Sequence, residues 1–283
     1  MIIDGKMIAE GIREKVARAV RGFAVPPTLA IVVVGENPVI ESFVRIKKKT
    51  GEALGIPVVE YHFPVSANAD ALVRTVARLG ADRGVAGIIV QLPLPPSIDA
   101  RKILDAVPLE KDVDVLSTNA VAAFRRGDAL VLPPIAGAMQ EILEHNMVAV
   151  SGKEALVLGH GRLVGVPAAL FLRHNGAHVT VVDKPIPDLA EHVRESDIIV
   201  SGVGKPGLLR PEWLKHGAVV IDAGTSEAEG KLVGDADPEC AKVAGLFTPV
   251  PGGVGPITVA LIFKNLLVLA KKTGQDGTYK VES

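Results

Sequence analysis

The chain has little of what marks secreted, membrane or nucleic-acid-binding proteins. Cys240 is the single cysteine, which excludes an internal disulfide and favours a reducing compartment. The formal net charge of −1 provides no basic footprint for a nucleic acid or an anionic membrane surface. No apolar run reaches the ~18 residues of a membrane span, and the first residues lack the apolar core of a signal peptide. The sequence therefore predicts a cytoplasmic protein whose partners are neither nucleic acids nor membranes.

Metal-ligand spacing is also missing from the sequence. The histidines are scattered, without the short regular separations that zinc sites use. We therefore predict no metal site at His145, His174, His178, His192 or His216.

Short β-rich runs alternate with helical patterns along the chain, which is typical of an α/β protein with parallel sheets. A length of 283 residues is enough for two domains. We place the boundary in the proline-marked segment 130–146 and expect the last helix, 257–272, to return to the first domain. The predicted domains are 1–134 plus 257–283, with a loosely ordered tail at 276–283, and 135–256. The expected strands are 28–35, 57–64, 87–93, 154–159, 178–183, 197–203 and 218–224, and the helices that separate the first three are 38–54 and 67–79.

The stretch VLGHGRLVGVP, residues 157–167, nearly matches the G-x-G-x-x-G pattern of dinucleotide-binding loops. Gly159 and Gly161 fit the pattern, whereas the third glycine, Gly165, comes one residue late. A buried strand precedes the loop and a helix can follow it, so a pyrophosphate would lie at the helix N-terminus. This arrangement predicts a dinucleotide-binding loop.

The identity of the dinucleotide stays open from these residues alone. Asp183 lies 24 residues after Gly159, near the position of the acid that binds an adenosine ribose, and a carboxylate there disfavours the 2′-phosphate of NADP. Lys184 and Arg162 could still neutralise that phosphate. A histidine such as His160 is more often a neighbour of a phosphate than a catalytic base.

On a helical projection of residues 38–54, Lys47 falls at the centre of an apolar arc. A lysine in such a place must extend to water, find a partner or lose its proton easily. The last property suits a general acid–base or charge-positioning lysine. The structural alternative is a lysine whose side chain runs along the rim of the core and keeps its ammonium group in water. The arc consists of Ile40, Phe43, Val44 and Leu54.

Two further polar features could converge on this lysine. Gln91 stands at the end of a predicted strand, where open α/β sheets place ligand contacts. Asp112 and Asp114 alternate in a predicted loop, so their carboxylates should point in different directions. Each feature is weak alone, because a strand-end glutamine often caps a strand and a loop aspartate often forms a turn.

Proline and glycine residues are most concentrated in the segment TPVPGGVGPIT, residues 248–258. Its prolines stiffen the backbone, and its glycines permit conformations and close approach denied to other residues. Pro256 suits the first turn of a helix. We expect a loop along which a flat ligand lies, in preference to a simple interdomain linker.

Several of these segments occur together in one known family. They are the opening IIDGKMIAEGIREKV, VQLPLP (90–95), EKDVD (110–114), SGK (151–153), VGKPG (203–207), GAVVIDAG (217–224), GKLVGD (230–235) and TPVPGGVGPIT (248–258). With them the chain resembles the bifunctional methylenetetrahydrofolate dehydrogenase/cyclohydrolases, known as FolD, from the N-terminus through the last helix. The combination of TPVPGGVGP with VQLPLP is the most specific part of the resemblance.

The resemblance implies a Rossmann-type nucleotide-binding domain, an α/β folate-binding catalytic domain, a cleft between them, and a homodimer. It also implies two reactions of one-carbon metabolism. Methylene-tetrahydrofolate gives a hydride to the nicotinamide of NADP, the family's usual cofactor, and the methenyl product is hydrolysed to formyl-tetrahydrofolate. Asp183 keeps NAD plausible as the cofactor.

The family's site residues carry over by motif. Lys47 would be the catalytic lysine, Gln91 its support, and Asp114 the partner of the amino-pyrimidine part of the pterin. The substrate would be bound by Phe43, Pro251, Gly252, Gly253, Val254 and Gly255, and the cofactor by Gly159, His160, Gly161, Asp183, Lys184 and Thr225. The late Gly165 is normal in this family, whose loop reads G-x-S-x-x-V-G-x-P.

The chain departs from the family near the substrate. Phe43 replaces a tyrosine four residues before the lysine, which removes a hydroxyl and affects hydration more than hydride transfer. Val115 replaces the glycine after Asp114, and one residue is missing near 117–119. The sequence PPIA at 133–136 replaces Pro-Cys-Thr-Pro, so the substrate rim is expected to differ.

A second group of departures touches the cofactor loop. His160 and Gly161 replace an Arg–Ser pair, and Lys184 replaces a serine. Two alternatives to the bifunctional enzyme remain at this point. One is a dehydrogenase whose cyclohydrolase activity is weakened by Phe43, and the other is a non-catalytic nucleotide- or folate-binding module. The retention of Lys47 on an apolar face argues against the second.

Overall fold

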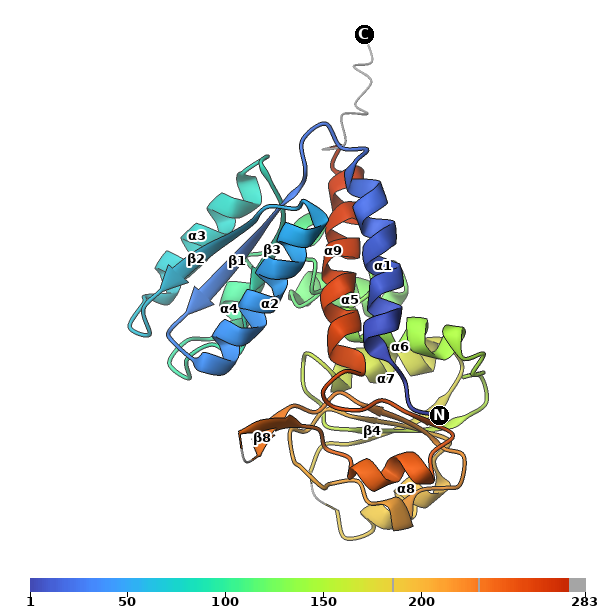
Figure 1. Ribbon diagram of the computed structural model, residues 1–283. Helices are drawn as coiled ribbons and strands as arrows, with labels where there is room; N and C mark the ends of the chain where they lie inside the picture. The colour runs from blue at the N-terminus through green and yellow to red at the C-terminus, as the bar shows by residue number, and fades with distance from the viewer. Residues whose placement is uncertain (185, 229, 275–283) are drawn as a thin grey trace. The chain divides into compact units, whose positions relative to one another are not determined.

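The structure is a computed structural model that describes residues 1–184, 186–228 and 230–274 (Figure 1). The described chain divides into two compact units. One contains Gly11–Pro133 and the chain from Val259 onward, and we call it the lysine unit. The other contains Met1–Glu10 and Pro134–Thr258, and we call it the glycine-loop unit. The predicted loose tail at 276–283 lies outside the described residues.

The division differs from the predicted boundaries at the start of the chain. The breaks at Pro133 and Thr258 lie next to the predicted ones, but Met1–Glu10 belong to the glycine-loop unit. Ile2 forms a parallel bridge with Phe247, and the Ile3 N–H donates to the Phe247 carbonyl over 2.9 Å. The first residues therefore continue the edge of a sheet whose other strands come more than 150 positions later.

The lysine unit is built on a three-stranded parallel sheet. Its strands are β1 (Thr28–Val34), β2 (Val58–Phe63) and β3 (Val85–Val90), in the order β2-β1-β3. The central strand β1 is buried from Leu29 to Val34, which explains its unbroken apolar sequence TLAIVVV. The helices of this part of the chain are α2 (Pro38–Leu54), α3 (Ala69–Ala81), α4 (Ala100–Leu104), α5 (Thr118–Arg126), and the parts of α1 (Gly5–Val20) and α9 (Val254–Lys272) that belong to it.

Helices cover both faces of this sheet, as the parallel strands require. On one face, alternate β1 residues such as Val32 pack with Leu72 and Val76 of α3. Helix α2 lies on the opposite side of the strands from α3 (Figure 1). Gly51 of α2 approaches Phe263 of α9, and a Cβ atom at position 51 would lie 3.3 Å from the Phe263 ring. The expected helix at 38–54 is thus anchored between the sheet and α9.

Local signals set both ends of α2. The Asn37 side chain accepts hydrogen bonds from the Val39 and Ile40 N–H groups over 2.9 and 3.2 Å, and proline occupies the first helical position. Gly55 ends the helix with φ +72°, a left-handed conformation that glycine adopts without strain. The predicted range of 38–54 is confirmed at both ends.

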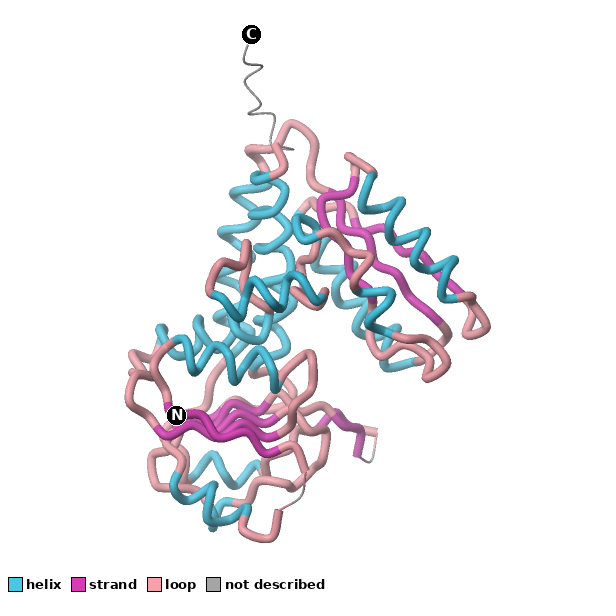
Figure 2. Tube along the Cα trace, turned by 180° about the vertical axis from the view of Figure 1, so that it is seen from behind, coloured by secondary structure: helices cyan, strands magenta, loops and turns pink. Residues whose placement is uncertain are grey.

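The elements of the glycine-loop unit are α6 (Pro134–His145), β4 (Glu154–Leu158), α7 (Gly165–His174), β5 (His178–Val182), α8 (Leu189–Glu195), β6 (Ile198–Ser201), β7 (Val219–Asp222), the hairpin β8 (Ser226–Ala228) and β9 (Lys231–Val233), and β10 (Leu246–Phe247). Five of the strands form a parallel sheet with the order β10-β7-β6-β4-β5. Helices lie on both of its faces (Figure 2). Residues of β4, β6 and β7 pack with Val193 of α8 and with Cys240, and burial raises the pKa of that thiol to about 12.

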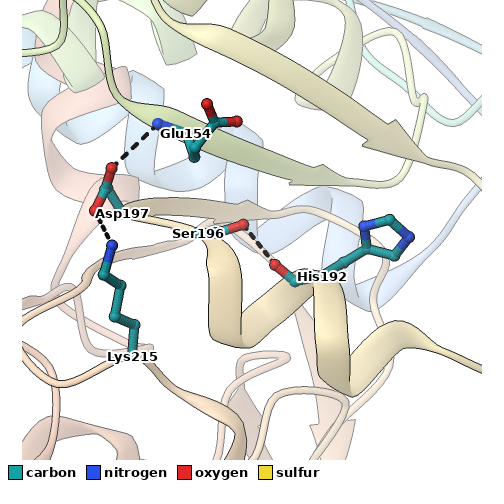
Figure 3. Close-up of polar contacts among 5 residues, drawn as sticks. All are labelled: Glu154, His192, Ser196, Asp197 and Lys215. Atoms are coloured by element: carbon teal, nitrogen blue, oxygen red, sulfur yellow. Dashed lines mark hydrogen bonds and ion pairs between the residues drawn. The ribbon is translucent and has the colours of Figure 1, made fainter.

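The amino ends of β4 and β6 are joined by Asp197 (Figure 3). Its carboxylate accepts hydrogen bonds from the Glu154 N–H over 3.1 Å and from the exposed Lys215 ammonium over 2.6 Å. The bond from Lys215 is the largest cause of the lowered pKa of Asp197. Asp197 thus links the starts of these two strands, whereas the loops at the carboxyl ends of the strands are where such sheets bind ligands.

Helix α9 corrects one expectation from the sequence. It has 19 residues and a mean hydropathy of 1.6, so by length and composition alone it is long and apolar enough to cross a membrane. The sequence reading missed this because Lys264 and Asn265 interrupt its apolar run. Within the structure, 61% of the apolar window is buried, as in the core helix of a folded domain.

Candidate active site

Lys47 lies in the buried stripe of α2. The buried residues of this helix are Ile40, Val44, Lys47, Gly51 and Leu54, which recur every three or four positions. The Lys47 residue is only 9% exposed. Its neighbour Lys48 points to water and pairs with Glu60 over 3.0 Å. Phe43, one turn before Lys47, is half-buried.

Gln91 holds the ammonium group of Lys47. It directly follows β3, and its N–H donates to the Val32 carbonyl over 2.9 Å, as in a continued strand. The Lys47 Nζ atom donates to Gln91 Oε1 over 2.9 Å. Gln91 Nε2 donates to the Leu92 carbonyl over 2.8 Å, which orients the amide so that its oxygen faces the lysine. Of the outcomes open to a lysine on an apolar face, this chain uses a buried partner.

The charges of Lys47 and Asp114 influence each other. Burial lowers the pKa of Lys47, and the negative charge of Asp114 partly offsets that effect. Burial also raises the pKa of Asp114 to about 6, although the charge of Lys47 acts in the opposite direction. The Asp114 residue as a whole is only partly buried. Lys47, Gln91 and Asp114 thus belong to one electrostatic cluster inside the lysine unit.

The two aspartates of the EKDVD segment do point in different directions. Asp112 is 3% exposed and turns inward. Its carboxylate accepts hydrogen bonds from the Leu116 N–H over 3.0 Å and the Ser117 N–H over 2.8 Å. Asp112 therefore stabilises the turn before α5, whereas Asp114 interacts electrostatically with Lys47.

Val115 has φ +57°, in the left-handed region. A β-branched residue is strained there, whereas glycine is not. A glycine here, as in the family that the sequence resembles, would adopt this conformation without strain, and this chain adopts it with valine. The Val115 side chain is 3% exposed, so its burial offsets part of the strain.

The sequence reasoning missed two polar residues that brace this turn. Asn265, in α9, donates to the carbonyls of Val113 and Leu132, both over 2.9 Å. Lys111 Nζ donates to the Asp82 carbonyl over 2.6 Å, at the end of α3. The available signal for Asn265 was a lone amide within an apolar helix, since a buried amide needs hydrogen-bond partners.

The loop after β4 is shaped by close backbone contacts. Gly159 has φ +91°, and its N–H donates to the Val182 carbonyl at the end of β5 over 2.8 Å. A Cβ atom at Gly165 would lie 2.1 Å from the Gly159 carbonyl oxygen, so only glycine allows α7 to start this close to the loop. Gly161 is exposed, and a Cβ atom there would meet nothing within 4 Å.

These observations suit a dinucleotide of the NADP type. The backbone at Gly161 is bare, and Val164, the residue before α7, provides no side-chain cap, so a phosphate could approach the first turn of the helix. Lys184 is exposed and Arg162 is half-buried beside this loop, and both carry the positive charge that a phosphate needs. Thr225 is exposed just after β7, at the carboxyl end of the same sheet.

Asp183 has a role within the protein that the sequence did not reveal. Its Oδ1 atom accepts a hydrogen bond from the His160 N–H over 3.0 Å and so joins the end of β5 to the glycine loop. His160 and Asp183 are both exposed. A carboxylate with this structural use need not signal a preference for NAD, and the ribose interpretation of Asp183 remains a prediction.

The residues predicted to line the folate differ in accessibility. Pro251 and Gly255 are exposed and Gly252 is half-buried with φ +106°. Gly253 and Val254 are buried. A Cβ atom at Gly253 would lie 2.6 Å from the Pro249 carbonyl oxygen, so this glycine is required by packing within the loop.

Across residues 1–184, 186–228 and 230–274, no group of three or more histidine, cysteine or acidic side chains could hold a metal ion. The chemistry available to the described site is therefore that of a lysine, an amide, a carboxylate and a nucleotide-type loop.

Two family profiles match this chain. Residues 3–114 match "Tetrahydrofolate dehydrogenase/cyclohydrolase, catalytic domain", and residues 133–274 match "Tetrahydrofolate dehydrogenase/cyclohydrolase, NAD(P)-binding domain". The "Bifunctional protein FolD" of Anaeromyxobacter dehalogenans is 43% identical over 281 residues. That comparison covers 97% of this chain and 99% of the relative.

Two solved structures are also similar over nearly the full length. The bifunctional enzyme FolD from Campylobacter jejuni has a TM-score of 0.93 at 33% identity, with 96% of this chain and 99% of that chain covered. The Trypanosoma brucei methylenetetrahydrofolate dehydrogenase-cyclohydrolase, solved with NADP and an inhibitor, has a TM-score of 0.91 at 38% identity. Here 96% of this chain and 98% of the other are covered.

Proposed function

Because this chain belongs to the tetrahydrofolate dehydrogenase/cyclohydrolase family, we propose that it oxidises methylene-tetrahydrofolate and then hydrolyses the product to formyl-tetrahydrofolate. NADP is the proposed cofactor and accepts the hydride when it is bound. The observation that carries the proposal is the buried Lys47–Gln91 hydrogen bond of 2.9 Å within the field of Asp114. A binding module would have no need to bury a charged lysine in this way.

Lys47 would manage the proton during hydration. Loss of hydride leaves a cationic methenyl carbon on the folate, water attacks that carbon, and a proton must leave the new hydroxyl group before the ring opens. The lowered pKa of Lys47 brings its ammonium nearer to an exchange of protons at neutral pH. Gln91 holds the Nζ atom in one place, so that the proton is taken up and returned at a defined position.

Asp114 would hold the substrate. With a pKa of about 6 it is mainly ionised at neutral pH. A carboxylate accepts two parallel N–H bonds, which matches the donor pattern of an amino-pyrimidine ring. The half-buried Phe43 offers a ring that can stack on a flat folate, one helical turn from Lys47.

The proposal is tested with purified protein, methylene-tetrahydrofolate and either NADP⁺ or NAD⁺. We expect reduction of NADP⁺, followed by formyl-tetrahydrofolate faster than the uncatalysed hydration of the methenyl product. Failure to reduce either nucleotide would refute the dehydrogenase. Accumulation of methenyl product at the uncatalysed hydration rate would refute the cyclohydrolase alone. The same assay on Asp183→Ser tests the ribose interpretation, which requires the ratio of NADP to NAD activity to rise.

Two further properties are proposed, one from the family resemblance and one from the single cysteine. A homodimer is expected, and sedimentation equilibrium should give twice the mass of the 29.6 kDa chain. A cytoplasmic location is expected because the single cysteine is buried and suits a reducing compartment. Fractionation of cells that produce the tagged chain would test it.

A further inference from the structure

Three glycine-containing segments of the glycine-loop unit converge on one buried carboxylate. They are VGKPG at 203–207, GAVVIDAG at 217–224 and GKLVGD at 230–235. Asp235 ends the third segment and is 0% exposed. Its Oδ2 atom accepts hydrogen bonds from Ser201 Oγ over 2.6 Å and from the Val203 N–H over 2.8 Å. Its Oδ1 atom accepts one from the Lys205 N–H over 2.6 Å. The Asp235 side chain is thus hydrogen-bonded to a different loop, 202–205, which directly follows β6.

The second segment is locked to the third from both sides. Asp222, at the end of β7, is 1% exposed and accepts a hydrogen bond from the Ala236 N–H over 2.8 Å. A Cβ atom at Gly234 would lie 2.1 Å from Asp222 Oδ2. In return, a Cβ atom at Gly224 would lie 2.2 Å from the Asp235 carboxyl carbon. Each glycine makes room for the aspartate of the other segment.

Loop 202–205 lies directly against the glycine loop that follows β4. The Gly202 N–H donates to the Leu158 carbonyl over 3.1 Å, at the end of β4. A Cβ atom at Gly159 would lie 3.2 Å from the Gly202 carbonyl oxygen, and one at Gly202 would lie 2.3 Å from Val164. Val203 itself is 46% exposed. Loop 202–205 therefore forms one wall beside the phosphate-type loop, at the carboxyl edge of the sheet.

We propose that Asp235 is a positioning residue for cofactor binding, because its carboxylate holds loop 202–205 in place against the glycine loop. The inference rests on the proposed NADP binding. Asp235 does not itself contact the dinucleotide. It accepts three donors at once, which a carboxylate can do and an amide of the same shape cannot. With asparagine, at least one buried N–H or O–H group faces another donor, and loop 202–205 loses its fixed position.

The test is Asp235→Asn, with the dissociation constant of NADP⁺ measured by calorimetry in the absence of folate. We expect that constant to rise about tenfold. Three further readouts separate positioning from general damage. Thermal unfolding of the ligand-free variant should be as cooperative as that of the unaltered protein. The affinity for folate without NADP⁺ should be unchanged. In the dehydrogenase assay, KM for NADP⁺ should rise by a larger factor than kcat falls.

Asp237→Asn is the matched control. It makes the same chemical change two residues later, where the carboxylate accepts a hydrogen bond from the Glu239 N–H over 2.8 Å. Its NADP⁺ affinity should equal that of the unaltered protein. If Asp235→Asn does not fold, Ser201→Ala carries the test, because it removes one of the three donors without changing the charge. We expect it to raise the dissociation constant about threefold.

The inference is overturned if folded Asp235→Asn binds NADP⁺ within twofold of the unaltered protein, or if it weakens folate binding equally. When only the serine variant folds, unchanged NADP⁺ affinity overturns it in the same way. If the unaltered protein does not bind NADP⁺ at all, the failure is that of the proposed function, and the two cases are thereby distinguished.

Discussion

The two units of this protein use buried carboxylates in opposite ways. In the lysine unit, Asp114 is partly exposed and faces the charge of Lys47, so burial raises its pKa to about 6. In the glycine-loop unit, Asp235 is fully buried, and its carboxylate accepts hydrogen bonds from the Ser201 hydroxyl group at the end of β6 and from two backbone N–H groups of loop 202–205. The first carboxylate remains available to a ligand at a cost in stability. The carboxylate of Asp235 is fully used in hydrogen bonds within the fold, and it would affect a ligand only through the backbone of loop 202–205.

The largest expected effect comes from removing the lysine. Lys47→Met keeps the length of the buried side chain but removes the proton carrier, so the hydration rate should fall by about 10²–10⁴-fold. NADP⁺ affinity, measured by calorimetry, should not change, because the glycine loop belongs to the other unit. Lys48→Met is the control, since this neighbouring lysine is exposed and pairs with Glu60 at the surface. Equal losses in the two variants would contradict the role assigned to Lys47.

The corresponding break in the glycine-loop unit is Gly165→Ala. The added Cβ atom would lie 2.1 Å from the Gly159 carbonyl oxygen, which forces the loop and α7 apart. Chemical denaturation should show a loss of about 1–3 kcal/mol in the free energy of unfolding. NADP⁺ affinity should fall while folate affinity stays the same. Gly161→Ala adds the same methyl group in open space and should leave stability unchanged, so a similar loss there would argue against the packing explanation.

Asp114→Asn should separate stability from function. The raised pKa means that the folded protein binds a proton between about pH 4 and 6 that the unfolded chain releases, so this group's contribution to stability falls as pH rises through that window. At pH 7 the variant should be more stable by about 1–2 kcal/mol, less than the full shift implies because Asp114 is partly exposed.

Urea unfolding of both proteins at pH 4 and pH 7 provides the measurement, with folate affinity as the functional counterpart. The stability gain should shrink at pH 4, and the variant should bind folate more weakly at both pH values. The raised pKa of Asp222, also about 6, is common to both proteins and cancels from the difference. A gain that is the same at the two pH values would mean that Asp114 does not titrate as described.

The smallest expected effect is that of Phe43→Tyr. The ring is half-buried one turn from Lys47, and a hydroxyl added there can take part in proton transfer. We expect the hydration rate to rise several-fold, with the dehydrogenase rate nearly unchanged because hydride transfer depends on position. The ratio of the two rates, measured in one assay, is the readout. A drop in both rates would mean that the added hydroxyl only disturbs packing.

Much of the fold was accessible from local patterns. The ranges of α2 and of the seven predicted strands agree with the structure to within a few residues, because burial imposes a periodicity that local sequence records. The two-residue strand β10 was not predicted. Lys47 could be singled out for the same reason, since a charged residue is conspicuous on the apolar face of a predicted helix. The roles of Gln91 and Asp114 came from the family resemblance, because a glutamine or an aspartate at a strand end or in a loop has many ordinary uses.

The sequence by itself therefore determined the order of the elements, the buried face of α2 and the glycine spacing of the nucleotide loop, all of which depend on neighbours within a few residues. Only the tertiary structure decided which distant groups meet. It paired Lys47 with Gln91 across 44 positions, linked Asn265 to Val113 across 152, and brought Asp235 to loop 202–205 from about 30 residues away. A hydrogen bond between distant residues leaves no period in the sequence. Only the packing of the sheets brings such groups within reach of each other.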